Sequence, residues 1–260
     1  MEVIMTMFSS KISASLLYHF TKDVKIVFSI LENGFYPRTA IEDISFMLPN
    51  YKESKVGIPM VCFTDIPLEN STEHRKEYGA YGIGMKKEWG IKKGLNPICY
   101  MIKNTEIYNA YNHLQFIVSQ QAQKLDKIEG KNNVHSIEVM EAVMDYAGYL
   151  KEYSSDSTYE LKPFYDEREW RYLPPFKDIE ENIDGNCNRL IGDMVNDPHE
   201  KEKLNNHMAE RYTLDFSVDD IEKIILNKNS EVGELVKLLY NSFKITQAEE
   251  FIKKIKVHPV

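Results

Sequence analysis

Leu16-Leu17-Tyr18-His19-Phe20-Thr21 is an apolar and aromatic stretch that predicts a short buried strand from Leu16 to Phe20. An amphipathic helix is expected directly after it, because apolar residues recur at i, i+3, i+4 and i+7 between Val24 and Leu31. Thr21 is suited to cap the start of this helix, and Asn33-Gly34 to end it. This arrangement places His19 at the end of a strand, immediately before a helix.

Further apolar runs predict the rest of a sheet. They are Pro59–Thr64, Tyr81–Met85, Ile98–Ile102, Glu169–Leu173, Arg211–Phe216, Lys223–Leu226 and a terminal strand at Ile255–His258. Helices are expected at Ser71–Tyr78, with Ser71 as the cap, and at Ser230–Phe243, while a loop is expected from Pro37 to Gly57. Because the strands are scattered and do not alternate strictly with helices, the sequence favours an α+β fold over a doubly wound sheet.

The middle of the chain has a different character. Glu106–Leu125 and Ser136–Glu152 both predict helices, and the polar segment Glu129–Asn133 predicts the turn between them. We expect a helical hairpin, residues 104–152, inserted into a single domain that spans residues 1–260.

Composition narrows the class of protein. The chain has 260 residues, 43% of them hydrophobic, and a net charge of −8, so it offers no broad basic surface for nucleic acid. The chain has an odd number of cysteines, and it has no Cys-x-x-Cys motif. The three cysteines, Cys62, Cys99 and Cys187, therefore argue against a disulfide framework or a zinc cluster. No apolar run approaches the roughly 18 residues that a membrane span needs. With no signal peptide recognised, a cytoplasmic protein is expected.

The segment Tyr18-His19-Phe20-Thr21 is the first candidate site. A neutral imidazole at this strand end can donate to or accept from a sugar hydroxyl, and Thr21 can also touch a ligand. The alternative is a histidine that is satisfied by the backbone while Tyr18 and Phe20 fill the core.

The second candidate is Glu167-Arg168-Glu169-Trp170-Arg171. On a strand, Glu167, Glu169 and Arg171 would share one face, with the two carboxylates about 7 Å apart. Such a pair can stabilise the positive charge that develops on a sugar, and Arg171 can keep a carboxylate ionised or bind phosphate. The alternative is a solvated face with cross-strand ion pairs.

A third candidate is the glycine-rich run from Tyr78 to Gly84. It lacks the following helix of a phosphate-binding loop, so its glycines indicate close backbone approach, with Tyr78 and Tyr81 free to stack on a ligand. Asp65 and His74 lie nearby in sequence, but their spacing fits no standard metal site, and no metal is expected.

Three stretches together resemble the AbiGi family of bacterial abortive-infection proteins. They are Leu17–Thr21 leading to Ile30–Arg38, then Ile58–Pro67 with His74 and Tyr78–Gly90, then Glu167–Tyr172 with Asp220–Leu226. The resemblance covers roughly residues 16–103 and 163–227, and Pro59-Met-Val-Cys-Phe-Thr-Asp-Ile-Pro67 is its most specific part. It implies a role in phage defence, in which AbiGi proteins are described as the antitoxin-like partner of a nucleotidyltransferase-like toxin.

Tyr18-His19-Phe20-Thr21 and the helix that ends in Asn33-Gly34 also look, more distantly, like the start of ADP-ribosyltransferases of the DarT type. This likeness implies a split mixed or antiparallel sheet with NAD as substrate and no metal. It implies that His19 binds a ribose hydroxyl of NAD and that Glu169 or Glu167 supports glycosidic cleavage. Tyr78 or Tyr81 would hold nicotinamide, and Arg38 or Arg171 the pyrophosphate.

Two hypotheses follow from these resemblances. In the first, an ADP-ribosyltransferase-like defence protein cleaves NAD and passes ADP-ribose to a macromolecule or to water. In the second, a non-catalytic regulator binds and restrains a partner toxin through its acidic surface and inserted hairpin. A third reading is a ligand-sensing domain that keeps the fold without turnover.

Overall fold

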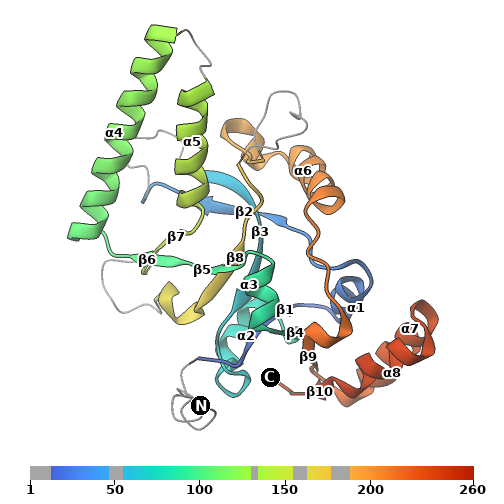
Figure 1. The fold of residues 1–260 in the computed structure, drawn as a ribbon. Coiled ribbons are helices and arrows are strands. Elements are labelled where there is room, and N and C mark those ends of the chain that lie inside the picture. Colours follow the sequence, from blue (N-terminus) through green and yellow to red (C-terminus); the bar gives the residue numbers. More distant parts are fainter. Residues whose placement is uncertain (1–12, 47–54, 130–133, 155–162, 177–187) are drawn as a thin grey trace, which may run out of the picture.

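A mostly antiparallel sheet of eight strands lies at the centre of the computed structural model, which describes residues 13–46, 55–129, 134–154, 163–176 and 188–260 (Figure 1). The strand order is β10-β9-β4-β1-β3-β8-β5, with β2 paired to β3 beside this path. Every pair in this sheet is antiparallel except β10 with β9. The α+β class, predicted from the scattered strands, is therefore confirmed, and the sheet is mostly antiparallel.

The strands of this sheet are β1 (Leu16–Thr21), β2 (Arg38–Asp43), β3 (Lys55–Thr64), β4 (Tyr81–Lys86), β5 (Asn96–Pro97), β8 (Glu169–Tyr172), β9 (Ile221–Leu226) and β10 (Ile255–Val257). A separate parallel pair joins β6 (Cys99–Met101) to β7 (Leu150–Glu152). The helices are α1 (Val24–Asn33), α2 (Thr72–Tyr78), α3 (Lys87–Lys92), α4 (Glu106–Glu129), α5 (Val134–Ala147), α6 (Pro198–Arg211), α7 (Val232–Ser242) and α8 (Ile245–Lys253).

The two faces of the sheet bury different cores. On one face, Leu17, Phe63 and Ile83 pack with apolar residues of α1, α3, α7 and α8. On the other face, Tyr18 and Phe20 pack against the segment before α2, and the even-numbered residues of β3 from Val56 to Met60 pack against the hairpin of α4 and α5. Because side chains alternate along a strand, β1, β3 and β9 contribute residues to the cores on both faces. Figure 1 shows α7 and α8 at one end of the molecule and the long hairpin at the other.

The cap of the first helix lies two residues later than expected. Asp23 is the N-cap of α1, and its carboxylate accepts a hydrogen bond from the Lys25 N–H at 2.8 Å. The prediction that Thr21 caps this helix is wrong, because the Thr21 hydroxyl instead donates to the Asp23 carbonyl. Gly34 ends the helix with φ of 81°, as the Asn33-Gly34 pair predicted.

Several other element predictions need correction. The expected loop from Pro37 to Gly57 contains β2, whose strand pairing to β3 was hidden by its polar sequence. The expected strand Arg211–Phe216 is wrong, because Arg211 ends α6 and Leu214 forms only an isolated bridge with Phe35. The helix α8 was missed altogether. Ser71 precedes α2 as predicted, but its hydroxyl donates back to Leu68 and caps nothing.

The helical hairpin is present where it was predicted, although its second helix is shorter. Glu106–Glu129 forms α4, and the expected helix Ser136–Glu152 divides into α5 and the strand β7. The turn predicted at Glu129–Asn133 falls on residues 130–133, outside the described part of the chain. Tyr108 and Tyr111 of α4 and Ala147 of α5 pack on the core formed with β3. The chain then returns through β7 to the sheet.

Gly79 provides a test of how tightly α2 packs against the first strand. Its φ is 138°, and a Cβ at this position would lie 1.9 Å from the Thr21 carbonyl oxygen. We therefore expect Gly79→Ala to lower the free energy of unfolding by roughly 3 kcal/mol or more, since backbone would have to move. At Gly233 in α7, an added Cβ would point into open space. Gly233→Ala is therefore expected to raise the free energy of unfolding by up to about 1 kcal/mol. Urea unfolding of both variants measures this, and equal effects would contradict the packing.

Candidate functional site

The two carboxylates of the Glu167–Arg171 segment reach their positions by different routes. Glu169 lies on β8, as expected, but Glu167 ends a 3-10 turn, Phe164–Glu167, before the strand. Arg168 between them has φ of 46°, in the left-handed region, so strand alternation does not extend back to Glu167. The prediction that all three residues lie along one strand is thus wrong for Glu167. Both carboxylates are nevertheless buried, at 8% exposure each.

Lys151 joins the two carboxylates. Its Nζ lies 2.7 Å from Glu167 Oε2 and 3.1 Å from Glu169 Oε2. The same ammonium lies 4.7 Å from the centre of the Phe164 ring, in a cation–π contact. Lys151 comes from β7, at the end of the inserted hairpin, and so ties the insertion to the sheet.

Arg171 holds Glu169 from the other side. Its guanidinium binds the carboxylate in a bidentate pair, with Nε at 2.5 Å from Oε1 and Nη2 at 3.1 Å from Oε2. Nη2 also lies 3.5 Å from Glu42 of β2, and Nη1 donates to the Gly148 carbonyl at 3.0 Å. Only 1% of Arg171 is exposed. We call Glu42, Lys151, Glu167, Glu169 and Arg171 the buried charge cluster.

The electrostatics of the cluster favour its charged state. Burial alone would raise the pKa of Glu169, but Arg171 and Lys151 outweigh it and lower that pKa to about 2. Burial would likewise lower the pKa of Lys151, yet the two carboxylates raise it above its usual range. Burial and Glu169 together raise the pKa of the neighbouring Cys62 thiol, so that thiol stays protonated. Lys151, Glu169 and Arg171 are therefore ionised and paired with one another or with neighbouring carboxylates.

Tyr78 extends the cluster toward α2. Its hydroxyl donates to Glu167 Oε1 at 3.0 Å, and burial together with Glu167 raises its pKa. Its ring lies 4.5 Å from that of His74. The structure thus brings together four of the predicted site residues: Tyr78, Glu167, Glu169 and Arg171. Glu167 and Glu169 have both oxygens occupied by partners within the chain.

His19 lies on the opposite face of the sheet from these carboxylates. Tyr18 pairs with Thr64 and Thr64 with Glu169, so Tyr18 and Glu169 share a face and His19 points the other way. The His19 ring contacts Phe35 and Phe63, and its Nδ1 lies 2.8 Å from the Cys62 carbonyl oxygen. Burial lowers the pKa of His19, so the ring is neutral at pH 7 and Nδ1–H donates to that carbonyl. A single cleft between His19 and Glu169 is not formed.

The remaining predicted ligand-binding residues are also separated. The side chain of Tyr81 lies on the same face of the sheet as His19, and its hydroxyl donates to Glu231 at 2.6 Å. Thr21 is buried, with its hydroxyl on the Asp23 carbonyl. Arg38 is exposed at the start of β2, where its Nη1 lies 3.4 Å from the Tyr36 hydroxyl. These three residues make no contact with the buried charge cluster among the interactions of the described residues.

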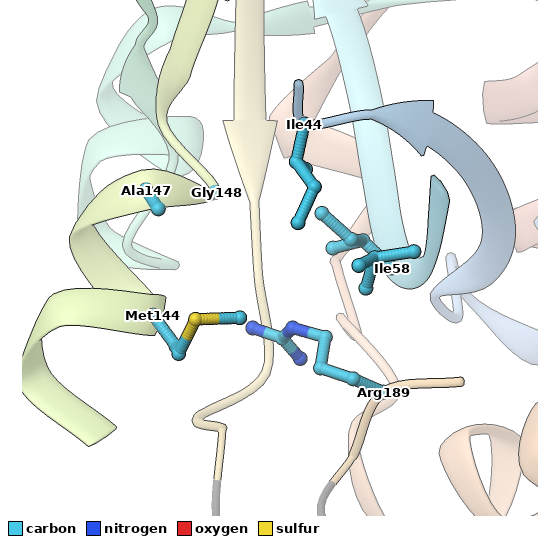
Figure 2. Close-up of a pocket in the computed structure, with 7 residues that line it drawn as sticks. Ile44, Ile58, Met144, Ala147, Gly148 and Arg189 are labelled. Atoms are coloured by element: carbon cyan, nitrogen blue, oxygen red, sulfur yellow. The ribbon is translucent and has the colours of Figure 1, made fainter. Parts of the chain in front are cut away.

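A small cavity lies between the hairpin and the sheet, next to Gly148, whose carbonyl binds Arg171. Its volume is about 10 Å³, which is room for about one water. Figure 2 shows Met144 and Arg189 at one end of it and Ile44 and Ile58 facing them. The full lining is Ile44, Val56, Ile58, Met144, Ala147, Gly148 and Arg189. A dinucleotide does not fit in a space of this size.

Sequence reasoning missed Lys151, Glu42 and the Gly148 carbonyl. Lys151 was assigned to a helix, Glu42 to a loop, and no motif marks either residue. Cys99 is exposed, and Cys187 lies outside the described residues. In the part of the chain that is described, no group of three or more His, Cys, Asp or Glu residues is placed to hold a metal. Nor does any described helix have the length and apolarity to cross a bilayer.

The comparisons with known proteins identify the family. A family model described as "Putative abortive phage resistance protein AbiGi, antitoxin" matches residues 33–227. The chain belongs to the AbiGi family. A relative named "Abortive phage resistance protein AbiGi", from Lactococcus lactis subsp. cremoris, is 29% identical over 163 residues, which are 56% of this chain and 64% of the relative. No solved structure matches, so the likeness of the sheet to ADP-ribosyltransferases stays a prediction. All members of the buried charge cluster fall within the matched residues, and His19 lies before them.

The Glu169–Arg171 pair should dominate the acid stability of this AbiGi-family chain. The folded-state pKa of Glu169 is about 2, below its ordinary 4.5, so the stabilisation is complete above pH 4.5 and is lost as pH falls toward 2. Glu169→Gln leaves Arg171 without its main counter-charge and is expected to cost roughly 3–5 kcal/mol of unfolding free energy at pH 7. The same change at Glu73, in an exposed pair with Lys76, should cost less than about 0.5 kcal/mol. Chemical denaturation from pH 3 to 7 compares them, and equal losses would argue against the pairing.

His19 should contribute a separate pH dependence. Because its folded-state pKa lies below the ordinary 6.5, the folded protein binds fewer protons than the unfolded chain, and stability falls as pH drops below 6.5. In His19→Gln the amide can still donate to the Cys62 carbonyl but does not titrate. We expect the stability curve of this variant to be flatter than that of the wild type between pH 6.5 and 5. Parallel curves would show that His19 is not held neutral.

Proposed function

We propose that this chain is a non-catalytic, antitoxin-like member of a phage-resistance pair that binds a partner toxin and restrains it. The description of the matching family model, which contains the word antitoxin, supports this proposal, as does the phage-resistance name of the Lactococcus relative. In this proposal the partner is the nucleotidyltransferase-like toxin that the family resemblance implies.

The observation that carries the proposal is the state of the two candidate catalytic carboxylates. Glu167 and Glu169 are buried and bound by Tyr78, Lys151 and Arg171. A carboxylate that is to stabilise a cation-like sugar has to face that sugar with a free oxygen. Here the carboxylate oxygens of Glu167 and Glu169 are bound by side chains of the same chain. His19 lies on the other side of the sheet. This arrangement favours a structural role for the cluster and a binding role for the protein.

The charge of the chain also fits a protein that acts by binding. A net charge of −8 steers an acidic protein toward a basic partner surface and raises the association rate at low salt. By the same electrostatics, the net negative charge disfavours the approach of phosphate-rich ligands. Association with the toxin should therefore weaken with increasing ionic strength.

Co-expression with a nucleotidyltransferase-like partner toxin tests the proposal. We expect the wild type, and equally His19→Gln and Tyr78→Phe, to restore growth and to co-purify with the toxin, because neither substituted group is needed for binding. Purified wild-type protein incubated with NAD should release no nicotinamide and label no macromolecule. Circular dichroism confirms that each variant is folded.

Three results would overturn this proposal. One is nicotinamide release by the wild type that His19→Gln or Tyr78→Phe abolishes. Another is toxicity of the chain expressed alone that a folded Glu169→Gln variant relieves. The third is restored growth without any physical complex between the chain and the toxin.

A further inference from the structure

The outer side of α4 carries an apolar stripe that the fold does not cover. Ile107, Leu114 and Ile117 are 59%, 57% and 43% exposed, and Ala110 between them is exposed as well. These residues follow one another at spacings of three, four and three, so they form a single row along the helix. Figure 1 shows α4 at the edge of the molecule, with α5 beside it on one side only. We call Ile107, Ala110, Leu114 and Ile117 the α4 stripe.

The helix α4 packs against the rest of the chain with a different face from the α4 stripe. That packing uses Tyr108 and Tyr111, each 8% exposed, in the core shared with β3 and α5. At 100° per residue, the buried row and the α4 stripe are centred about a third of a turn apart. The helix therefore has two apolar rows, and intramolecular packing accounts for one of them.

The sequence around the stripe is free of charge. Residues 107–123 contain no Asp, Glu, Lys or Arg, although 28% of the whole chain is charged. An exposed helix that serves only solubility normally carries charged residues on its outer face. Depletion of charge around exposed apolar side chains is instead typical of the centre of a protein interface. In a chain with a net charge of −8, such a segment is where a second acidic molecule can approach with the least repulsion.

We propose that the α4 stripe is a homodimer interface, in which α4 packs antiparallel to α4 of a second copy of this chain. A two-fold axis passing near Asn112 would place Ile107 opposite Ile117 of the partner copy, and Ala110 opposite Leu114 of the partner copy. Every position of the stripe then has an apolar partner, as a self-complementary two-fold interface requires. The small Ala110 faces the large Leu114, which allows the two helices to approach closely.

The spacing of the stripe supports this geometry. Three-four-three spacing is that of the a and d positions of a heptad, which form the seam between paired helices. The two hairpins would then form a four-helix arrangement, with the buried rows inside each copy and the stripes between copies. This dimer does not depend on the proposed antitoxin role, and it would stand if that role were refuted.

The first test compares two substitutions of equal exposure. Leu114 and Phe116 are each 57% exposed, but Phe116 points about 140° away from the centre of the stripe. Sedimentation equilibrium at pH 8 should show a monomer–dimer equilibrium for the wild type from about 1 µM to about 1 mM. Leu114→Glu should raise the dimer Kd at least about tenfold, because two carboxylates enter the apolar seam. Phe116→Glu should leave it unchanged, and both variants should melt at the wild-type temperature.

The second test determines the antiparallel register. Ile107→Lys and Ile117→Glu should each weaken the homodimer, since a charge then faces isoleucine at both ends of the seam. In an equimolar mixture, one end of the heterodimer would pair the introduced ammonium with the introduced carboxylate, and the other would keep its two isoleucines. We therefore expect the mixture to dimerise more tightly than either variant alone. In a parallel dimer the introduced ammonium and carboxylate would not face each other, and the mixture would not regain dimer affinity.

A wild type that stays monomeric throughout the concentration range would overturn the proposal. So would a dimer that Leu114→Glu and Phe116→Glu weaken equally, or a mixture that shows no recovery. A monomer whose binding to the toxin is lost in Leu114→Glu and kept in Phe116→Glu would assign the stripe to the toxin and refute the homodimer.

Discussion

The burial of the Arg171 guanidinium is the constraint on which the rest of the structure depends. A cation that is 1% exposed is stable only if carboxylates and carbonyls replace the water it has lost. Glu169 supplies the main counter-charge from the same strand, Glu42 a second from β2, and Gly148 a carbonyl from the end of α5. Each partner belongs to a different part of the chain. Correct placement of β2 and of the inserted hairpin is therefore coupled to the satisfaction of this one side chain.

The same constraint explains why the carboxylates differ from those of a catalytic pair. A catalytic carboxylate has to keep an oxygen free for the reacting centre, whereas a buried ion pair is costly unless all its hydrogen-bonding capacity is used. Lys151 and Arg171 use that capacity, and they keep Glu169 ionised despite its burial. The residue types that indicate chemistry in a sequence are thus the ones that also build a satisfied ionic core. Contacts distinguish these two uses, and residue order does not.

The sequence predicted local structure better than it predicted the site. The strand at Leu16, the helix from Val24 and the strand at Pro59 were recovered because apolar periodicity is a local signal. The strand β2 was not, since its sequence Arg38-Thr-Ala-Ile-Glu-Asp43 is polar and its pairing with β3 is what makes it a strand. Lys151 was missed for a related reason: its role depends on the return of the hairpin to the sheet, which no local pattern encodes.

The relation between His19 and Glu169 shows most clearly where sequence reasoning ends. Each residue sits on a predicted strand, and alternation predicts which neighbours on its own strand share its face. The relation between two strands also needs their register, here Tyr18 opposite Thr64 and Thr64 opposite Glu169. A shift of one residue in either pair would have brought His19 and Glu169 to one face. Register is set by the cores on both sides of the sheet, in which Leu17 and Phe63 belong to one and Tyr18 to the other. The packing of these apolar residues thus decides that the histidine and the carboxylate serve separate parts of the molecule.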